Sequence, residues 1–327
     1  MRDFSYFRAG SLDDARQHAT QPGAMLLAGG TTLLDLAKCG VAEPDSVVDI
    51  SHLSGLSQIA ADADGVTIGA LAKMEDVARS PGIRADYPAV SQSLLLAASP
   101  QLRNMATIGG NLLQRTRCPY FRDPATFFAC NKRNPGSGCS AIGGVTRNHA
   151  VLGTSEACIA VYPGDLAVAL VALDATIDLG GRKVTADDFF VLPGDTPDRE
   201  TILERGEMVV AVLIPASPIA RHSTYLKIRD RQSYEFATAS AAVGLEMEPD
   251  GRTVRDIRVA LGGVATKPWR ARAVEEALIG KPLDAGIIEK ASRLAMDGAI
   301  AHGANRYKIE LAPRVIARTI LNLGGLA

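Results

Sequence analysis

This sequence has few aromatic residues, almost no net charge and no long apolar run. Aromatic side chains make up 5% of its 327 residues, and the formal net charge is −1. A nucleic-acid-binding domain normally carries a strongly basic surface, so this charge balance argues against a nucleic-acid partner. The apolar stretches are broken within about ten residues, well short of the roughly 20 that a membrane helix needs. We therefore expect no membrane span.

Secretory and hydrolytic signatures are also missing. The amino-terminal stretch from Met1 to Tyr6 has no apolar segment of the signal-peptide type. We expect the protein to fold in the cytoplasm, where grouped cysteines favour metal or redox chemistry over structural disulfides. No Gly-x-Ser-x-Gly elbow and no His-Glu-x-x-His pair occurs, so the sequence carries neither of these signatures of hydrolytic enzymes.

The rest of the composition, 47% hydrophobic and 22% charged, is that of a globular protein long enough for two or three domains. We divide the chain into residues 1–57, 58–207 and 208–327. The first part alternates strand and helix, the second has predicted helices at 91–98 and 165–173, and the third combines strands with helices. The third part is predicted to have strands at 209–214, 223–229, 237–246 and 254–262 and helices at 270–279, 285–301 and 307–323.

A segment at about 115–158 has neither helical nor strand period, and it contains or borders four of the five cysteines. Cys118, Cys130, Cys139 and Cys158 are separated by eleven, eight and eighteen residues. These spacings match no zinc finger, which uses short Cys-x-x-Cys knuckles. An iron–sulfur cluster can take ligands from well-separated points of a loop. The spacing therefore favours a [4Fe–4S] cluster, with a structural zinc ion or four buried thiols as alternatives. Cys39, far upstream, is expected to be a core residue.

The same segment is basic. Between Arg115 and Ser155 there is one acidic residue, Asp123, and there are six basic ones: Arg115, Arg117, Arg122, Lys132, Arg133 and Arg147. Nearby cations lower the pKa of a thiol and offset the negative charge of a thiolate-ligated cluster. The charge pattern thus supports a metal-bearing loop. His149 lies in this segment and could be a ligand or a proton relay, but an ordinary loop histidine is the simpler interpretation.

Two glycine pairs are candidates for binding phosphate. Leu27-Ala28-Gly29-Gly30-Thr31-Thr32 follows a predicted strand and opens a predicted helix, so its backbone N–H groups can point at an anion. Thr107-Ile108-Gly109-Gly110-Asn111 offers a second such turn. Neither is a dinucleotide fingerprint or a Walker loop, and a single glycine pair is equally well explained by a tight turn. Together the two turns suit a diphosphate held from both sides, which predicts a dinucleotide.

These motifs, with Gly164-Asp165-Leu166 and Lys227-Ile228-Arg229-Asp230-Arg231, occur in an order that resembles the FAD-binding subunits of the xanthine dehydrogenase / aldehyde oxidoreductase family of molybdenum hydroxylases. The resemblance covers essentially the whole chain. The runs around the cysteines resemble the insert of the bacterial periplasmic aldehyde oxidoreductase subgroup. The implied fold class is α+β: a two-part FAD-binding domain of the PCMH type, then a C-terminal antiparallel sheet with helices like that of the CO dehydrogenase flavoprotein.

The resemblance also implies roles for individual residues. The pyrophosphate and ribityl chain of FAD would be held by the two turns: Leu27, Ala28, Gly29, Gly30, Thr31, Thr32, Leu33, Leu34, Asp35, Thr107, Ile108, Gly109, Gly110 and Asn111. Asp165 would contact the flavin or its ribityl hydroxyls, and Lys227 would lie beside the isoalloxazine. The [4Fe–4S] ligands would be Cys118, Cys130, Cys139 and Cys158. No residue of this chain is expected to act on a substrate as acid or base.

By the same resemblance, the chain would carry electrons within a heterotrimer. An aldehyde would be oxidised at molybdenum in a large subunit, and electrons would pass through a small [2Fe–2S] subunit to FAD here and then to an external acceptor. Co-export to the periplasm with a signal-bearing partner is a further hypothesis by analogy. The alternatives are the flavin subunit of a related enzyme such as 4-hydroxybenzoyl-CoA reductase, a zinc-stabilised assembly protein, and an independent covalent-flavin oxidase. The last is disfavoured because neither glycine turn contains a histidine or cysteine to bond the ring.

Overall fold

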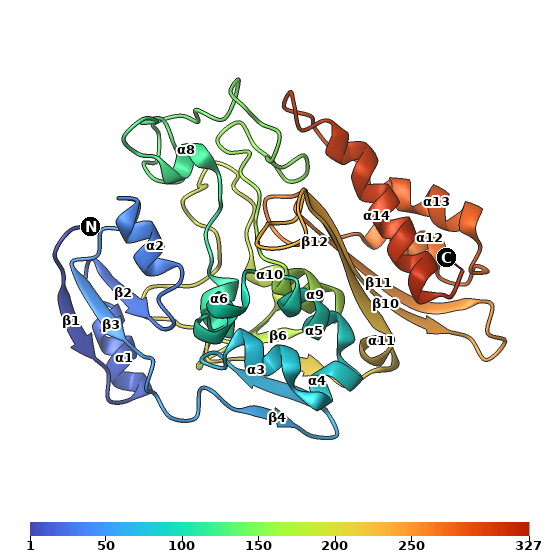
Figure 1. Ribbon diagram of the computed structural model, residues 1–327, viewed down its shortest axis with the longest axis horizontal. Helices are drawn as coiled ribbons and strands as arrows, with labels where there is room; N and C mark the ends of the chain where they lie inside the picture. Colours follow the sequence, from blue (N-terminus) through green and yellow to red (C-terminus); the bar gives the residue numbers. More distant parts are fainter. Residues whose placement is uncertain (327) are drawn as a thin grey trace.

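The first fifty residues form a small parallel sheet with two helices, seen on the left of Figure 1 in a computed structural model that describes residues 1–326. The strands are β1 (Ser5–Arg8), β2 (Ala24–Leu27) and β3 (Ser46–Asp49), in the order β1-β3-β2, and the helices are α1 (Leu12–Ala19) and α2 (Leu33–Lys38). Ser11 caps α1 by accepting a hydrogen bond from the Asp14 N–H at 3.1 Å. The predicted strand–helix alternation is confirmed.

A five-stranded antiparallel sheet forms the middle of the molecule. Its strands are β4 (Ile59–Ala61), β5 (Gly65–Gly69), β6 (Thr176–Asp178), β7 (Lys183–Thr185) and β8 (Ala211–Pro215), in the order β4-β5-β8-β6-β7. The prediction that residues 209–214 belong to the C-terminal sheet is wrong, because β8 pairs with β5 and β6. Local alternation identified the strand but carried no information about its pairing partner. The three-part division of the chain at residues 57 and 207 remains a prediction.

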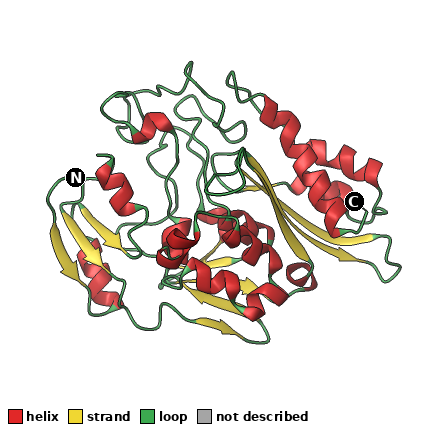
Figure 2. Cartoon of the chain, in the orientation of Figure 1, coloured by secondary structure: helices red, strands yellow, loops and turns green. Residues whose placement is uncertain are grey.

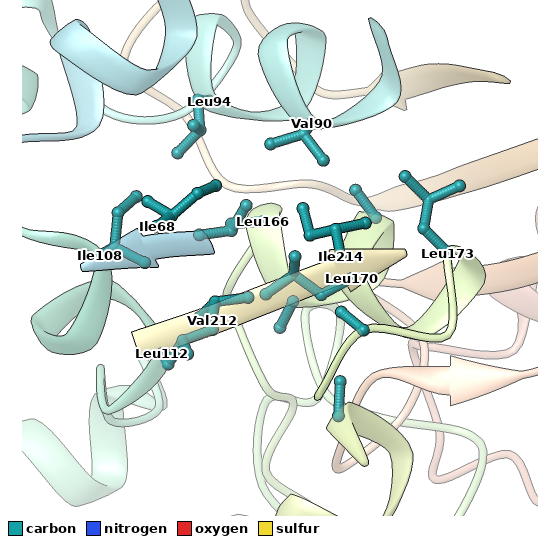
Figure 3. Close-up of a cluster of buried hydrophobic side chains, with 14 of the residues drawn as sticks. Ile68, Val90, Leu94, Ile108, Leu112, Leu166, Leu170, Leu173, Val212 and Ile214 are labelled. Atoms are coloured by element: carbon teal, nitrogen blue, oxygen red, sulfur yellow. The ribbon is translucent and has the colours of Figure 1, made fainter. Parts of the chain in front are cut away.

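Helices cover the middle sheet and complete its core. They are α3 (Met74–Arg79), α4 (Pro81–Asp86), α5 (Pro88–Leu95), α6 (Pro100–Met105), α7 (Ile108–Leu112), α9 (Leu166–Ala172) and α10 (Ala186–Phe189). Figure 3 shows Leu94 of α5 on one side of the strand residues Ile68 and Val212, with Leu170 of α9 among the same buried side chains. Every residue of α9 is buried, so this helix is apolar on all sides. The predicted helices at 91–98 and 165–173 correspond to α5 and α9.

The C-terminal part is an antiparallel sheet with helices packed against it, on the right of Figure 1. Its strands are β9 (Ser223–Ile228), β10 (Ala239–Met247), β11 (Val254–Gly262) and β12 (Trp269–Arg270), in the order β12-β11-β10-β9. Its helices are α11 (Pro218–Arg221), α12 (Arg272–Leu278), α13 (Ala285–Arg293) with the 3₁₀ turn η1 (Leu294–Met296), and α14 (Tyr307–Leu323). The helix predicted at 285–301 is shorter than expected. Within residues 1–326, no helix is both long and apolar enough to cross a bilayer.

The cysteine-bearing segment is an excursion of loops that leaves and re-enters the middle unit at one place. Figure 2 shows it at the top of the molecule as loop, with the short helix α8 (Pro119–Arg122) as its regular element. At its base the Tyr162 hydroxyl donates to the Leu112 carbonyl at 3.1 Å, and the Thr116 hydroxyl donates to the Val161 carbonyl at 2.9 Å. The segment is mostly loop, as the sequence indicates, and its two ends are hydrogen-bonded to each other.

Candidate functional site

The two glycine turns line one large cavity between the first sheet and the middle unit. The cavity has a volume of about 650 Å³, within the range of ligand pockets in proteins. Gly29 makes the close approach possible: a Cβ on this residue would lie 2.1 Å from the Met105 carbonyl oxygen, just before the second turn. The predicted pairing of the two turns around one site is therefore seen in the fold.

Local backbone geometry explains the shape of both turns. Gly30 has φ +73°, a conformation that favours glycine. The Thr107 side chain caps α7 by accepting from the Gly110 N–H at 3.3 Å, whereas Thr32 makes no side-chain cap on α2. The first N–H groups of an uncapped helix are available to an anion. The donor set and the cavity size fit a dinucleotide diphosphate.

The cavity contains only part of the predicted FAD set. The predicted residues that line it are Ala28, Gly29, Gly30, Thr31, Thr32, Leu33, Thr107, Gly109 and Gly110. The others, which are outside its lining, are Leu27, Leu34, Asp35, Ile108, Asn111, Asp165 and Lys227. Arg115, Leu203 and residues 205–209 also line the cavity, a role that the sequence did not predict for them. Residues 203–209 contain no glycine motif and no periodic pattern. Their place at the cavity is therefore visible only in the folded structure.

Asp165 and Lys227 form a buried ion pair. Lys227 Nζ lies 2.8 Å from Asp165 Oδ2 and also donates to the Leu96 carbonyl at 3.1 Å, and the Tyr225 hydroxyl donates to Asp165 Oδ1 at 2.5 Å. Burial raises the pKa of Asp165 above the ordinary carboxyl value, and the neighbouring ammonium group opposes that rise. Asp165 precedes α9 and Lys227 lies in β9, so the pair ties the C-terminal sheet to the middle unit. A direct contact of either residue with the flavin remains a prediction.

Replacing Lys227 by methionine is expected to destabilise the protein by about 3–5 kcal/mol, because it leaves a buried carboxylate without its partner. The loss should be larger at neutral pH than near pH 4. Without Lys227, the pKa of Asp165 is higher in the folded protein than in the unfolded chain. Near pH 4 the folded protein can keep Asp165 protonated at little cost in stability. At neutral pH the unfolded chain ionises Asp165 freely, so the folded state loses the most stability there. Chemical denaturation at both pH values measures this, with the exposed Lys183→Met as the matched control. Equal stability losses in both variants would contradict the interpretation.

The four cysteines of the insertion come together around a second, small cavity. Cys118, Cys130, Cys139 and Cys158 all line it, and its free volume is about 10 Å³. Among residues 1–326, no three His, Cys, Asp or Glu side chains are placed, as they stand, to hold a single metal ion. Cys39 lies outside this cavity and is half-buried.

Backbone turns bring the cysteines together. Cys130 and Cys139 face each other across a β-bridge, held by Asn131 N–H to the Gly138 carbonyl at 2.7 Å. Cys118 immediately precedes α8. Cys158 closes a tight turn with Ser155, whose hydroxyl accepts its N–H at 3.3 Å. Cysteines spread from position 118 to position 158 therefore line one cavity with little regular structure between them.

Burial lowers the acidity of two of these thiols. It raises the pKa of Cys118 to about 12 and also raises the pKa of Cys158, where the Lys132 ammonium acts in the opposite direction. A metal ligand must be a thiolate, so metal binding at these positions would release protons. Four thiols on one apolar cavity fit a Cys₄ site in kind.

One acidic residue connects the two cavities. Glu200 accepts from Arg115 Nε at 2.5 Å and from Lys132 Nζ at 2.9 Å. Arg115 lines the large cavity, whereas Lys132 is buried against the cysteines. The sequence predicted that the basic residues offset cluster charge, but several instead pair with acids outside the segment. These contacts are Arg117 and Arg122 with Asp35 at 3.0 and 2.7 Å, and Arg147 with Asp230 at 2.6 Å.

His149 is not an ordinary loop histidine. Its side chain is buried, and Nε2 lies 3.2 Å from the Cys118 Sγ. Burial lowers the pKa of His149 to about 4, so the ring is neutral at pH 7. Its other ring nitrogen, Nδ1, is buried without a hydrogen-bond partner among the described residues.

The fold and the large cavity are those of a flavin-binding oxidoreductase subunit, and comparisons with known proteins show its family. Residues 2–217 match the FAD binding domain in molybdopterin dehydrogenase, and residues 223–323 match the CO dehydrogenase flavoprotein C-terminal domain. The chain is 44% identical to the aldehyde oxidoreductase FAD-binding subunit of Escherichia coli, with 98% of each chain covered. It is 30% identical to the glyceraldehyde dehydrogenase medium chain of Sulfolobus acidocaldarius, over 88% of this chain and 85% of that one.

Solved structures of related enzymes have the same fold as this chain. Quinoline 2-oxidoreductase from Pseudomonas putida superimposes with a TM-score of 0.74 at 26% identity, covering 99% of this chain and 98% of that chain. A carbon monoxide dehydrogenase from Hydrogenophaga pseudoflava gives 0.75 at 26% identity, with the same coverage. This chain therefore belongs to the family of FAD-binding medium subunits of molybdenum hydroxylases, of the aldehyde oxidoreductase and CO dehydrogenase type. The predicted family and the predicted α+β fold are confirmed.

Proposed function

We propose that this chain is the electron-transfer subunit of a molybdenum-dependent aldehyde oxidoreductase and carries both FAD and a [4Fe–4S] cluster. Electrons from aldehyde oxidation at molybdenum in a large subunit would pass through a small [2Fe–2S] subunit to FAD, and from there to an external acceptor. Bound FAD supplies the electron-accepting chemistry, and the side chains of this subunit bind, orient and shield it.

The observation that best supports FAD binding is that both glycine turns line the same cavity. Gly29, Gly30 and Thr31 from the first turn and Thr107 and Gly109 from the second line the same space. Their N–H groups would hold the pyrophosphate and ribityl chain. The residues of the predicted set outside the lining keep their proposed roles through the resemblance alone. Asp165 is proposed to contact the flavin or its ribityl hydroxyls, and Lys227 to lie beside the isoalloxazine, with the ion pair fixing the position of the ammonium group.

The cluster is supported by the four thiols on the second cavity. A single zinc ion needs donors about 2.0–2.3 Å from one point. A cuboidal cluster accepts more widely spaced sulfurs, which agrees with the long sequence separations of Cys118, Cys130, Cys139 and Cys158. The buried Lys132 beside them supplies positive charge.

Substrate and partners are proposed from the relatives. The relative from Escherichia coli is an aldehyde oxidoreductase subunit, which supports an aldehyde as the substrate of the whole complex. Several relatives are called medium chains, which supports a heterotrimer with a large molybdenum-cofactor subunit and a small [2Fe–2S] subunit. Co-export to the periplasm with a signal-bearing partner is part of the same proposal, and finding the complex only in the cytosolic fraction would contradict it.

The test is an anaerobic purification in which iron, sulfide, zinc and flavin are assayed on one sample. About one FAD and about four irons per chain are expected for a single [4Fe–4S] flavoprotein. FAD accompanied by zinc, or by free thiols without iron, would remove the cluster and keep the flavin subunit. Zinc without flavin would overturn the proposed function as a whole.

A further inference from the structure

His149 touches the cysteine site from the side of the C-terminal part, and no role has been assigned to it. Its Nε2 atom lies 3.2 Å from Cys118 Sγ, within hydrogen-bond distance for sulfur. The ring is almost fully buried, and the nearest aromatic side chain is Tyr120, with ring centroids 6.0 Å apart. An imidazole in this position can donate a hydrogen bond from Nε2 to the sulfur, either as the Nε2–H tautomer or as the protonated ring.

The protonation state of a metal-bound cysteine decides which atom donates the hydrogen bond between His149 and Cys118. A ligating thiolate has no proton, so it can only accept, and the contact is attractive only if Nε2 carries the hydrogen. In the neutral ring, Nδ1 then presents a lone pair to its surroundings.

The backbone around His149 is held in place from two sides. Its N–H donates to the Thr146 carbonyl at 2.8 Å. The Asn305 amide, two residues before α14, donates to the Ala150 carbonyl at 2.8 Å and to the His149 carbonyl at 3.4 Å. Asn305 is itself fully buried. The C-terminal part therefore fixes the position of the ring against the insertion.

We propose that His149 is a positioning residue that donates its Nε2–H to the Cys118 thiolate and thereby raises the reduction potential of the cluster bound there. The inference rests on the proposed function. Hydrogen bonds to ligating sulfurs are a recognised determinant of cluster potential. A donor stabilises the more negative, reduced state, so its removal should make the cluster harder to reduce.

The experiment compares three variants of the whole complex, purified anaerobically. His149→Phe keeps a ring of similar size without a donor, and His149→Gln keeps an N–H donor. His302→Phe is the matched control, because that histidine is bonded to Thr154 Oγ1 at 3.1 Å and contacts no cysteine. For each variant, iron and flavin per chain are assayed and the cluster midpoint potential is measured by EPR-monitored redox titration.

We expect unchanged iron and flavin contents and a more negative cluster potential in His149→Phe, a smaller shift in His149→Gln and none in His302→Phe. An unshifted potential in His149→Phe would overturn the proposal, as would equal shifts in the Phe and Gln variants. Loss of iron from both His149 variants would also overturn it and identify His149 as a ligand. If the unmodified complex contains no iron, the proposed function itself fails, and this is seen before any variant is measured.

Discussion

Replacing Cys158 by serine is expected to abolish the retention of a four-iron cluster while FAD stays bound. Cys158 is a buried member of the four-thiol cavity, in a turn that holds its backbone in place. A serine hydroxyl in that position remains protonated and is a far weaker ligand for iron than a thiolate. After anaerobic purification, the iron content per chain should therefore fall, whereas the flavin content per chain should stay the same.

Cys39→Ser is the matched control for this experiment. It makes the same chemical change at the cysteine outside the cavity, so iron and flavin should both equal those of the parent. A Cys158→Ser protein that keeps about four irons per chain would show that this thiol is not a ligand. Equal iron loss in the two serine variants would point to general instability.

Replacing Gly29 by alanine is expected to weaken FAD retention by about tenfold or more, although alanine adds only one methyl group. A Cβ at this position would meet the Met105 carbonyl oxygen at 2.1 Å and its carbon at 2.9 Å. Backbone atoms cannot move aside as a side-chain tip can, so the two turns that line the cavity must separate. Overpacking of this kind costs about 1–3 kcal/mol, and 1.4 kcal/mol corresponds to a tenfold change in affinity.

The measurement is the dissociation constant of FAD for the deflavinated and reconstituted complex. Gly82→Ala in α4 is the control, because a Cβ there meets no atom within 4 Å and its backbone is not in the left-handed region. The iron content should be unchanged in both variants. Wild-type FAD affinity in Gly29→Ala would show that the close approach of the two turns does not shape the flavin site.

The sequence predicted best those features that depend on neighbouring residues. Ser11 before α1 and Gly29–Gly30 after β2 are local signals, and the strand–helix order of the first unit follows from them. The bounds predicted for α14 agree exactly with Tyr307–Leu323 because its apolar stripe is long and regular. The grouping of the four cysteines was also predictable, because few other roles suit so many thiols in one loop.

Features that depend on distant partners were not predictable. The strand at 209–214 was identified, but its pairing with β5 brings together residues more than 140 positions apart, and alternation says nothing about the partner. Glu200 carries no motif, yet it pairs with cations from both cavities. The contact of His149 with Cys118 was missed because it joins residues 31 positions apart in a segment with no helical or strand period. The FAD contacts of Asp165 and Lys227 remain untested predictions.

The closed base of the insertion has a consequence for how such subunits diversify. Because Leu112 and Tyr162 are hydrogen-bonded to each other, the chain leaves and rejoins the middle unit at nearly the same point. The cost in chain entropy of lengthening a loop between fixed ends grows only slowly with its length. A lineage can therefore gain or shed the cysteine module, and with it the proposed cluster, while the strands and helices beneath keep their order and packing.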